Sequence, residues 1–429
     1  MADNPSMTAP WTCPFCPLLC DRFTVAASPG APLALAGSDC PRAQAGLARF
    51  VAVPSAAQPL IDGRHVALDD AITAAAQCLS ASRQSLFGGL GTDVAGARAL
   101  YRLACETGAI ADAANGRALM HGLRALQDRG AFTTTLAEVR GRADLIVCLT
   151  GSPTERQPEF YRRCGIGEAT EGAPLARHLV VLGSAPVDAQ RVLPPGLPGV
   201  TSEALAWHGD LFTTVSVLAA LVAGRTVRDA PPALAALAAR LLAARYAVLV
   251  WEAGALPAQG ALIVEGINAL VGTLNRSTRA ASFPLGGGDG AATVNQVFAW
   301  LGGLPLRTRL GPAGLEHEPL RFDAGRLLAD GAVDALLWIA SFGTEAAVPQ
   351  TALPRIVLGH PACATTDANT VFIPVSTPGI GSAGHLFRTD GVVLMPLSAV
   401  QADGLPTVAD VVGRLTLAVQ SLRQQRAAA

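Results

Sequence analysis

Lysine is absent from this chain, and all 32 of its basic residues are arginines. The absence excludes the lysine of nucleotide-binding P-loops and every mechanism built on a lysine Schiff base, including pyridoxal-phosphate chemistry, because each requires a titratable amine. Charge of either sign is also scarce: 15% of the 429 residues are charged, and the formal net charge is -1. We therefore expect neither nucleic acid nor an acidic membrane surface as a partner.

Long apolar runs are lacking too, although half of the residues are hydrophobic. The longest candidate, Leu211–Gly224, is interrupted by Thr213, Thr214 and Ser216 and is shorter than the ~20 residues that span a membrane. The N-terminal segment MADNPSMTAP has no basic residue and no apolar core, so it lacks the pattern of a secretory signal. These features predict a soluble cytoplasmic protein, and its length predicts two or three domains.

The most informative stretch is Trp11–Arg42, which carries four of the nine cysteines. Cys13, Cys16 and Cys20 form a C-x2-C-x3-C run, and Cys40 follows beside a proline. Three close thiols and one remote thiol suit an iron–sulfur cubane, which needs four thiolates that converge from a folded loop. Two alternatives stay open: a zinc site, which more often uses two separated C-x2-C pairs, and thiols that hold no metal. Nothing in the sequence indicates the oxidising compartment that a disulfide framework needs.

Apolar runs of strand length alternate with helical patterns through most of the chain. The runs are mostly apolar throughout, which is typical of parallel strands that are covered on both faces. This alternation predicts an α/β fold with more than one doubly wound sheet. The expected strands are 85–90, 145–149, 179–182, 247–251, 335–339, 356–358 and 371–375, and the expected helices are 69–82, 92–107, 211–223, 232–244, 261–274, 293–301 and 407–424.

Glycine-rich turns follow several of these strands. The first expected strand runs into Gly88, Gly89 and Gly91, and Thr92 is the predicted N-cap of the next helix. A strand–glycine–helix turn can approach a phosphate closely, but the spacing is not G-x-G-x-x-G, so a simple tight turn stays an alternative. Other such loops stand at 150–153 and 379–384. In an open α/β sheet, loops at the carboxyl ends of the strands bind the ligands.

Five segments, taken together and in order, resemble the B subunit of formylmethanofuran dehydrogenase, a member of the molybdopterin oxidoreductase superfamily. The resemblance extends along almost the whole chain. It implies a molybdopterin-oxidoreductase-like fold, in which an N-terminal iron–sulfur-type subdomain is followed by doubly wound parallel-sheet lobes. The segments are the cysteine run that ends in Cys40-Pro41, IADAANGRALMHG at 110–122, DLIVCLTGSP at 144–153, NQVFAWLGGLP at 295–305 and FIPVSTPGIGSAGHLFRTDG at 372–391.

The Pro- and Gly-rich stretch Leu193–Gly199 is a candidate boundary between the two lobes. It gives three expected domains: a cysteine-cluster subdomain at 1–55, a first α/β lobe at 56–199, and a second lobe with a C-terminal return segment at 200–429.

The resemblance also implies where a site would lie. A 4Fe-4S cluster would be held by Cys13, Cys16, Cys20 and Cys40. A pterin groove would be lined by Gly88, Gly89, Gly91, Gly151, Ser152, Gly379, Arg388 and Asp390.

One departure from the family stands at the metal-ligating cysteine, which is Met120 here, directly before His121. A thioether is a neutral, weak donor, whereas a thiolate holds molybdenum or tungsten. Ser152 also replaces the family's asparagine. We therefore assign no catalytic residue, regard Met120 and His121 as a degenerate site, and expect no anchored molybdopterin or tungstopterin guanine dinucleotide.

Such degeneration is known in one branch of the family, the B subunit of the formyltransferase/hydrolase complex of methylotrophic bacteria. That complex moves a formyl group from tetrahydromethanopterin to methanofuran on its D subunit and hydrolyses it to formate on its A subunit. The resemblance implies a non-redox, structural subunit with A, C and D subunits as partners. Two alternatives stay open: an active molybdenum- or tungsten-dependent dehydrogenase subunit, and an iron–sulfur electron-relay subunit.

Overall fold

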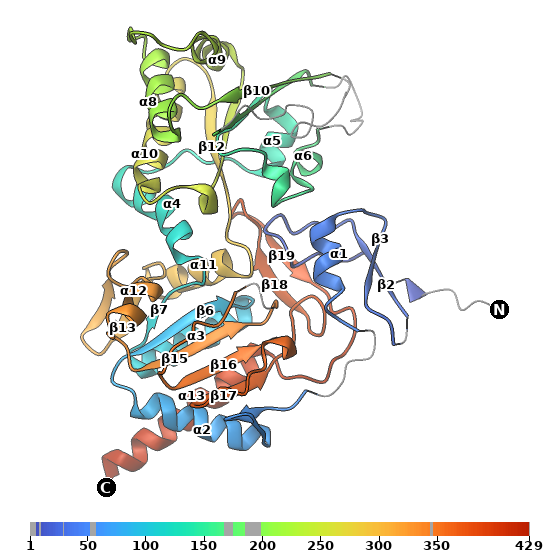
Figure 1. The fold of residues 1–429 in the computed structure, drawn as a ribbon, viewed down its shortest axis with the longest axis vertical. Helices are drawn as coiled ribbons and strands as arrows, with labels where there is room; N and C mark the ends of the chain where they lie inside the picture. Colours follow the sequence, from blue (N-terminus) through green and yellow to red (C-terminus); the bar gives the residue numbers. More distant parts are fainter. Residues whose placement is uncertain are drawn as a thin grey trace, which may run out of the picture. The chain divides into compact units, whose positions relative to one another are not determined.

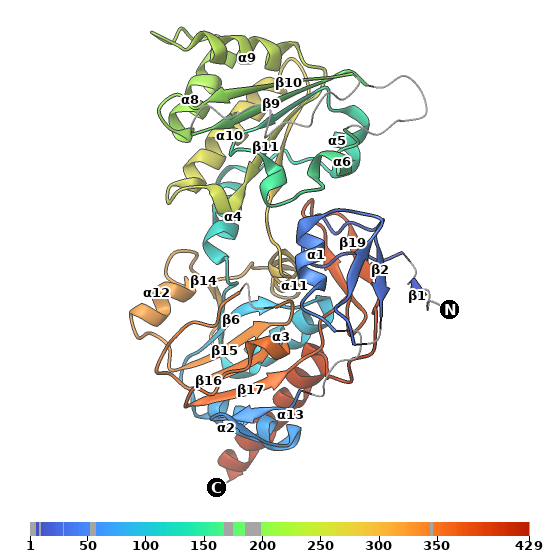
Figure 2. The ribbon, with the colours of Figure 1, turned by 45° about the vertical axis from the view of Figure 1, so that its right-hand side comes forward.

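The computed structural model describes residues 6–7, 10–28, 30–51, 57–166, 175–184, 199–343 and 346–428. The chain divides into two compact units, each of which has its own sheet (Figures 1 and 2). Unit 1 consists of Met1–Gly116 and Gly287–Ala429, and unit 2 consists of Arg117–Gly286. Unit 2 is therefore inserted into the sequence of unit 1.

A nine-stranded mixed sheet forms the centre of unit 1, with the order β14-β13-β7-β6-β15-β16-β17-β4-β5. The five strands from β7 to β17 run parallel, and antiparallel strands flank them on both sides. The chain adds β7 on one side of β6 and the later parallel strands β15, β16 and β17 on the other, so the strand order reverses between β6 and β15. The strands are β4 (Leu60–Ile61), β5 (Arg64–His65), β6 (Ser85–Gly91), β7 (Ile110–Ala111), β13 (Thr308–Gly311), β14 (Gly314–His317), β15 (Ala335–Ala340), β16 (Arg355–Gly359) and β17 (Thr370–Pro374).

Helices cover this sheet. One helix, α13, packs against α2 and α3, and α2, α3 and α11 contact strands of the sheet. Another, α12, places Leu327 in a cluster with Leu86, Leu336 and Trp338 of the strands. Because the central strands are buried on both faces, they are apolar throughout instead of alternating. The helices are α2 (Leu68–Ala81), α3 (Val94–Thr107), α11 (Ala291–Gly302), α12 (Ala324–Ala329) and α13 (Val408–Ala428), with the short 3-10 helix η3 (Pro361–Cys363).

Two smaller elements complete unit 1. The cysteine stretch belongs to a subdomain with the antiparallel sheet β1-β2-β3, and the hairpin β18-β19 lies late in the chain. Leu19 of the cysteine stretch shares a small core with Leu386 and Met395 of the hairpin, so the two elements support each other. Their bounds are β1 (Ser6–Met7), β2 (Thr24–Ala27), β3 (Ala34–Ala36), α1 (Pro41–Leu47), β18 (Gly384–Phe387) and β19 (Leu394–Leu397).

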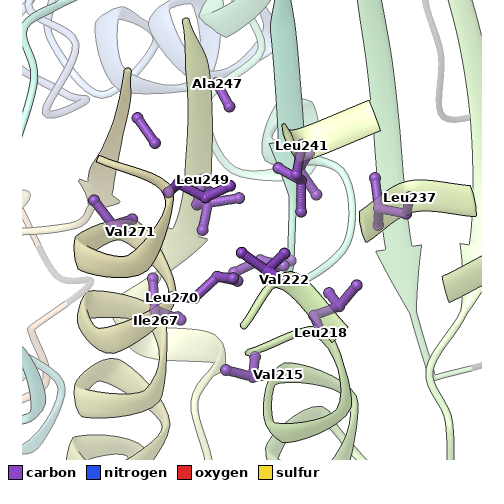
Figure 3. Packing of buried hydrophobic residues seen from close by; sticks show 14 of the residues in the cluster. Val215, Leu218, Val222, Leu237, Leu241, Ala247, Leu249, Ile267, Leu270 and Val271 are labelled. Carbon is purple, nitrogen blue, oxygen red and sulfur yellow. The ribbon is translucent and has the colours of Figure 1, made fainter. Parts of the chain in front are cut away.

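Unit 2 is built on a five-stranded sheet with the order β10-β9-β8-β11-β12, in which all neighbours are parallel. Its strand order reverses between β8 and β11. Leu249 of the sheet packs with Val215, Leu241 and Ile267 from three helices (Figure 3). The elements are α4 (Gly116–Arg129), α5 (Leu136–Arg142), β8 (Leu145–Cys148), η1 (Pro153–Glu155), α6 (Phe160–Arg163), β9 (Arg177–Gly183), β10 (Val200–Ala206), α8 (Leu211–Val222), α9 (Pro232–Ala243), β11 (Ala247–Glu252), η2 (Ala253–Ala255), α10 (Gly260–Leu274) and β12 (Ala280–Leu285).

The predicted α/β architecture with parallel sheets is confirmed, and each expected strand and helix is present within a few residues. One local prediction is wrong: α3 is capped by Asp93 and not by Thr92. The Asp93 carboxylate accepts a hydrogen bond from the N–H of Gly96 at 3.0 Å, as an N-cap does. Among the described residues, no helix combines the length and apolar character that a membrane span requires.

The two compact units also divide the chain differently from the expected lobes at 56–199 and 200–429. Strands β9 and β10 lie on opposite sides of the expected boundary and yet pair along their whole length, and β8 pairs with β11 in the same way. Each expected lobe therefore contributes strands to both sheets. The candidate boundary Leu193–Gly199 lies, except for Gly199, outside the described residues.

A buried ion-pair cluster in unit 1 links segments that are distant in sequence. The Arg307 guanidinium donates to the carboxylates of Asp112 (3.1 Å) and Asp323 (2.6 Å) and to the carbonyl of Pro319 (2.6 Å). The N–H of Ala324, at the start of α12, donates to the second Asp112 oxygen at 2.9 Å. Burial raises the pKa of Asp112 to about 6, against the lowering effect of Arg307. The cluster fixes the ends of β7, β13 and α12 to one another.

We expect Arg307→Ala to lower the free energy of unfolding by about 3–5 kcal/mol, because it leaves two carboxylates without their buried partner. Loss of Arg307 raises the pKa of Asp112 further, so the folded state holds the proton more tightly than the unfolded state. The loss of unfolding free energy in Arg307→Ala should therefore be larger at about pH 8 than at about pH 5. Chemical denaturation at both pH values measures it. Arg326→Ala, which removes an exposed pair with Asp330, is the control; equal effects of both variants would contradict the prediction.

Candidate functional site

The four cysteines of the N-terminal motif lie together in unit 1. All four are buried, with 3% to 8% of each residue exposed. The N–H of Cys13 donates to the carbonyl of Cys20 at 2.9 Å, which closes the loop between them. The thiols of Cys16, Cys20 and Cys40 are near enough to Cys13 to raise its pKa. Cys40, which is remote in sequence, therefore lies in the same buried region as the other three cysteines. That the four thiols converge on one metal group stays a prediction.

The surroundings of these thiols suit a group that supplies positive charge. Burial is the main cause that raises the pKa of Cys13 well above its usual value and that of Cys16 to about 11. Free thiols at Cys13 and Cys16 are therefore protonated near neutral pH. Backbone N–H groups of Phe15 and Leu18 act in the opposite direction on Cys13 and Cys16, and Arg42 also lowers the pKa of Cys16. Such N–H···S contacts tune the sulfurs of iron–sulfur clusters.

A single metal ion has a narrower requirement than a cluster, because sulfurs around one zinc ion lie within about 4 Å of one another. Across the part of the chain that the structure describes, no group of three or more histidine, cysteine or acidic side chains is arranged to hold a metal ion. A cubane takes four thiolates spread around a larger body, and that these four cysteines hold one stays a prediction.

The cysteine loop is fixed by the late glycine-rich segment. The indole N–H of Trp11 donates to the carbonyl of Gly379 at 2.7 Å, and the N–H of Thr389 donates to the carbonyl of Pro17 at 2.8 Å. A Cβ at Gly379 would lie 3.3 Å from Pro14. Gly379, a predicted pterin contact, therefore packs against the cysteine loop.

Arg388 is held by Asp390. Its guanidinium donates from Nε (3.1 Å) and Nη2 (2.5 Å) to the carboxylate of Asp390, and the pair is largely buried, with 11% and 0% of the side chains exposed. A planar guanidinium that is already engaged on a carboxylate is not available for bidentate contact with a phosphate.

The glycines at the end of β6 lie where the strand order of unit 1 reverses. A Cβ at Gly88 or Gly89 would come within 2.6–2.8 Å of the Trp338 ring or of backbone on β15, so these two glycines make room for protein atoms. Gly91 lines a small pocket with Phe15, Arg49 and other residues. This pocket is small and is not the long groove that a pterin dinucleotide needs.

Met120 and His121 lie on α4 in unit 2, with 3% and 5% exposed. The His121 ring packs against the start of α10, where a Cβ at Gly260 would be 2.7 Å from the ring. The next residue, Gly122, lies close to the ring of Trp251 at the carboxyl end of β11, where an added Cβ would be 3.2 Å from the ring. The degenerate site is thus tightly packed within unit 2.

Gly151 and Ser152 follow β8, beside the point where the strand order of unit 2 reverses. Gly151 has a φ of 93°, a conformation that favours glycine. The hydroxyls of Ser152 and Thr154 lie 2.8 Å apart. Sequence reasoning missed Glu252, which ends β11 nearby. Its N–H donates to the Thr150 hydroxyl at 2.9 Å, and its carboxylate lies 3.6 Å from Arg156. The signal was present, since Glu252 is the only charged residue of an otherwise apolar strand.

One expectation spans both units: that Met120 and His121 face Gly88–Gly91 and the loop at 379–384. Met120 and His121 belong to unit 2, whereas the two glycine-rich segments belong to unit 1. This expectation stays a prediction.

Comparison with known proteins finds similar B subunits of two kinds of complex. The chain is 32% identical over 331 residues to the B subunit of the formyltransferase/hydrolase complex Fhc of Methylorubrum extorquens, covering 76% of this chain and 87% of that protein. It is 25% identical over 404 residues to the B subunit of the tungsten-containing formylmethanofuran dehydrogenase 2 of Methanocaldococcus jannaschii, covering 89% and 91%. No protein-family model matches the chain.

A solved structure is also similar. It is the formyltransferase/hydrolase complex (FhcABCD) from Methylorubrum extorquens in complex with methylofuran, with a TM-score of 0.73 and 30% sequence identity to the matched chain. The match covers 85% of this chain and 99% of that chain.

We expect Gly260→Ala to lower the free energy of unfolding by about 1–3 kcal/mol, because the added methyl group would overlap the His121 ring. The matched control is Gly141→Ala on α5, where nothing lies within 4 Å of the new Cβ. That control should be neutral or should stabilise by up to ~1 kcal/mol, since alanine favours the helix. Equal denaturation midpoints for Gly260→Ala and the wild type would show that His121 is not held as described.

Proposed function

This chain belongs to the family of B subunits of formyltransferase/hydrolase complexes, and on that basis we propose that it is a non-redox, structural subunit of such a complex. Its partners in this proposal are the A, C and D subunits, the other chains of the related FhcABCD structure. The complex would transfer a formyl group from tetrahydromethanopterin to methanofuran and release it as formate. The B subunit itself would carry no catalytic residue and would act in the cytoplasm.

The observation that carries the proposal is Met120. It occupies the position at which the resemblance to formylmethanofuran dehydrogenase expects a metal-ligating cysteine, and it is buried beside His121. A neutral thioether neither balances the charge of a high-valent metal nor holds it as a thiolate does. The packing of His121 against Gly260 gives this histidine a structural role that needs no metal.

The residues expected around a pterin support the same conclusion. Gly88 and Gly89 are backed by Trp338, Gly379 by Pro14, and Arg388 is bound to Asp390. These four residues are thus engaged within the chain, which argues against a pterin dinucleotide, because its phosphates require open backbone amides and guanidinium groups. We further propose that the two units have a molybdopterin-oxidoreductase-like fold, whose N-terminal subdomain is of the iron–sulfur type.

The cysteine loop favours one addition to this proposal. Cys13, Cys16, Cys20 and Cys40 would hold a 4Fe-4S cluster. Such a cluster would supply one-electron transfer or, without a redox partner, would hold the loop together as a structural group. In a structural subunit we propose the second role. An electron-relay subunit is the second candidate function, and the convergence of the four buried thiols is the observation that favours it.

We expect Met120→Leu to leave formyl transfer and hydrolysis by the assembled complex unchanged. Leucine keeps the apolar volume, so stability should change by less than about 1.5 kcal/mol, while the sulfur is removed. Met120→Cys, which introduces a thiol, should not create formylmethanofuran-dependent reduction of an electron acceptor. Activity assays and metal analysis of the purified complex provide the measurement. Stoichiometric molybdenum or tungsten, with an electron-transfer activity that His121→Ala abolishes, would instead identify a working dehydrogenase subunit.

The cluster has its own test, which does not depend on activity. Anaerobic reconstitution of the wild-type chain should bind about four iron ions per chain and release protons, because the thiols must ionise. The double variant Cys13→Ser/Cys16→Ser should bind none, and Cys78→Ser, a change outside the motif, should behave as the wild type. A reduced sample that gives no electron paramagnetic resonance signal and contains no iron would refute the proposal of a cluster. A reducible cluster that exchanges electrons with the partner subunits would favour the relay.

A further inference from the structure

An apolar band lies on the surface of unit 1 across three elements. Trp300 and Leu301, at the end of α11, are 62% and 47% exposed. Leu315 of the β13-β14 hairpin is 40% exposed, and Leu394 of β19 is 41% exposed. We refer to these four residues as the Trp300 band.

Contacts show that the band is continuous. The Trp300 ring meets Phe387 of β18 edge to face, with 5.1 Å between the ring centroids, and Phe387 pairs directly with Leu394 across the hairpin. On the other side, Leu315 lies against Gly302, where a Cβ would be 3.2 Å away. A tryptophan that is anchored on one edge and open on the other is a typical centre of a protein interface.

The chemistry around the band favours an apolar partner. Arg309 and Glu316, next to Leu315, form an ion pair at 2.5 Å, and Arg388 is bound to Asp390 beyond Phe387. These two cations are thus neutralised within the chain, and neither offers the unpaired positive charge that attracts nucleic acid or an acidic membrane.

The size of the band fits a subunit interface better than an isolated surface residue. Its exposed apolar area is on the order of 400 Å², similar to the largest patches on monomers, which are often functional. It would supply the apolar centre of a contact that buries about 800 Å² on each partner. The similar chain of known structure was solved as one of four kinds of subunit in a complex.

We propose that the Trp300 band is the docking surface for an apolar face on another subunit of the same formyltransferase/hydrolase complex. This inference rests on the proposed function, since it names the surface by which the structural subunit holds a partner.

The test is co-expression of the chain with its A, C and D subunits, followed by affinity purification through a tag on a partner and mass determination of the assembly. Trp300→Glu and, separately, Leu394→Glu should reduce the amount of this chain recovered by at least tenfold, since each places a charge in the apolar centre. Leu394→Glu leaves the Trp300–Phe387 contact intact. The matched control Leu417→Glu, at a 68% exposed position on α13, should be recovered like the wild type, and circular dichroism of each variant should match the wild type.

Failure of the docking surface and failure of the proposed function give different results. If the wild-type chain assembles and both band variants assemble equally well, the docking surface is refuted while the proposed function stands. If the wild-type chain joins no A, C or D subunit, the proposed function fails and this inference fails with it. If the isolated chain forms a dimer that Trp300→Glu dissociates, a second copy occupies the band, and the proposal of a different subunit is overturned.

Discussion

The closure of one sheet edge by the cysteine loop is the constraint on which the rest of unit 1 depends. Parallel strands present their connecting loops at a common carboxyl edge, and an open edge of this kind is where α/β proteins bind ligands. Here the indole N–H of Trp11 is hydrogen-bonded to the carbonyl of Gly379. The ring of Phe50 lies edge to face on the ring of His360, which follows β16, with 4.9 Å between the ring centroids. Aromatic side chains and backbone hydrogen bonds thus fill space that a large cofactor would need.

Much of the fold could be predicted because fully buried parallel strands appear in the sequence as short apolar runs. Edge strands were not found in this way. Val200–Ala206 is an edge strand with several exposed positions, and Ala280–Leu285 contains a proline and also lies at an edge. The division into units was missed for another reason. Strand neighbours in a parallel sheet are chosen in three dimensions, so β8 pairs with β11 although a long segment separates them.

The candidate site shows the same limit at the level of single residues. Spacing along the chain was sufficient to place the cysteine loop, because three of its thiols are local. The roles of Arg388, Gly88 and Gly379 depended on partners that sequence alone does not identify: a carboxylate two residues away, a tryptophan from another strand and a distant proline. Residues that would serve a cofactor in one protein serve packing here. The buried Arg307 cluster was likewise invisible, since Asp112 and Arg307 meet only in the folded chain.

The insertion of unit 2 within unit 1 has a consequence for the order of events on the ribosome. The chain emerges from its N-terminus, so unit 2 is complete before β15, β16 and β17 have been synthesised. Until then β6 lacks its parallel neighbour β15, and the cysteine loop lacks Gly379 and Thr389, which hold it. Unit 2 can fold as the chain grows, whereas the first half of unit 1 must wait with apolar strands uncovered. The nascent N-terminal segment is therefore the part of this protein that most needs protection by chaperones during translation.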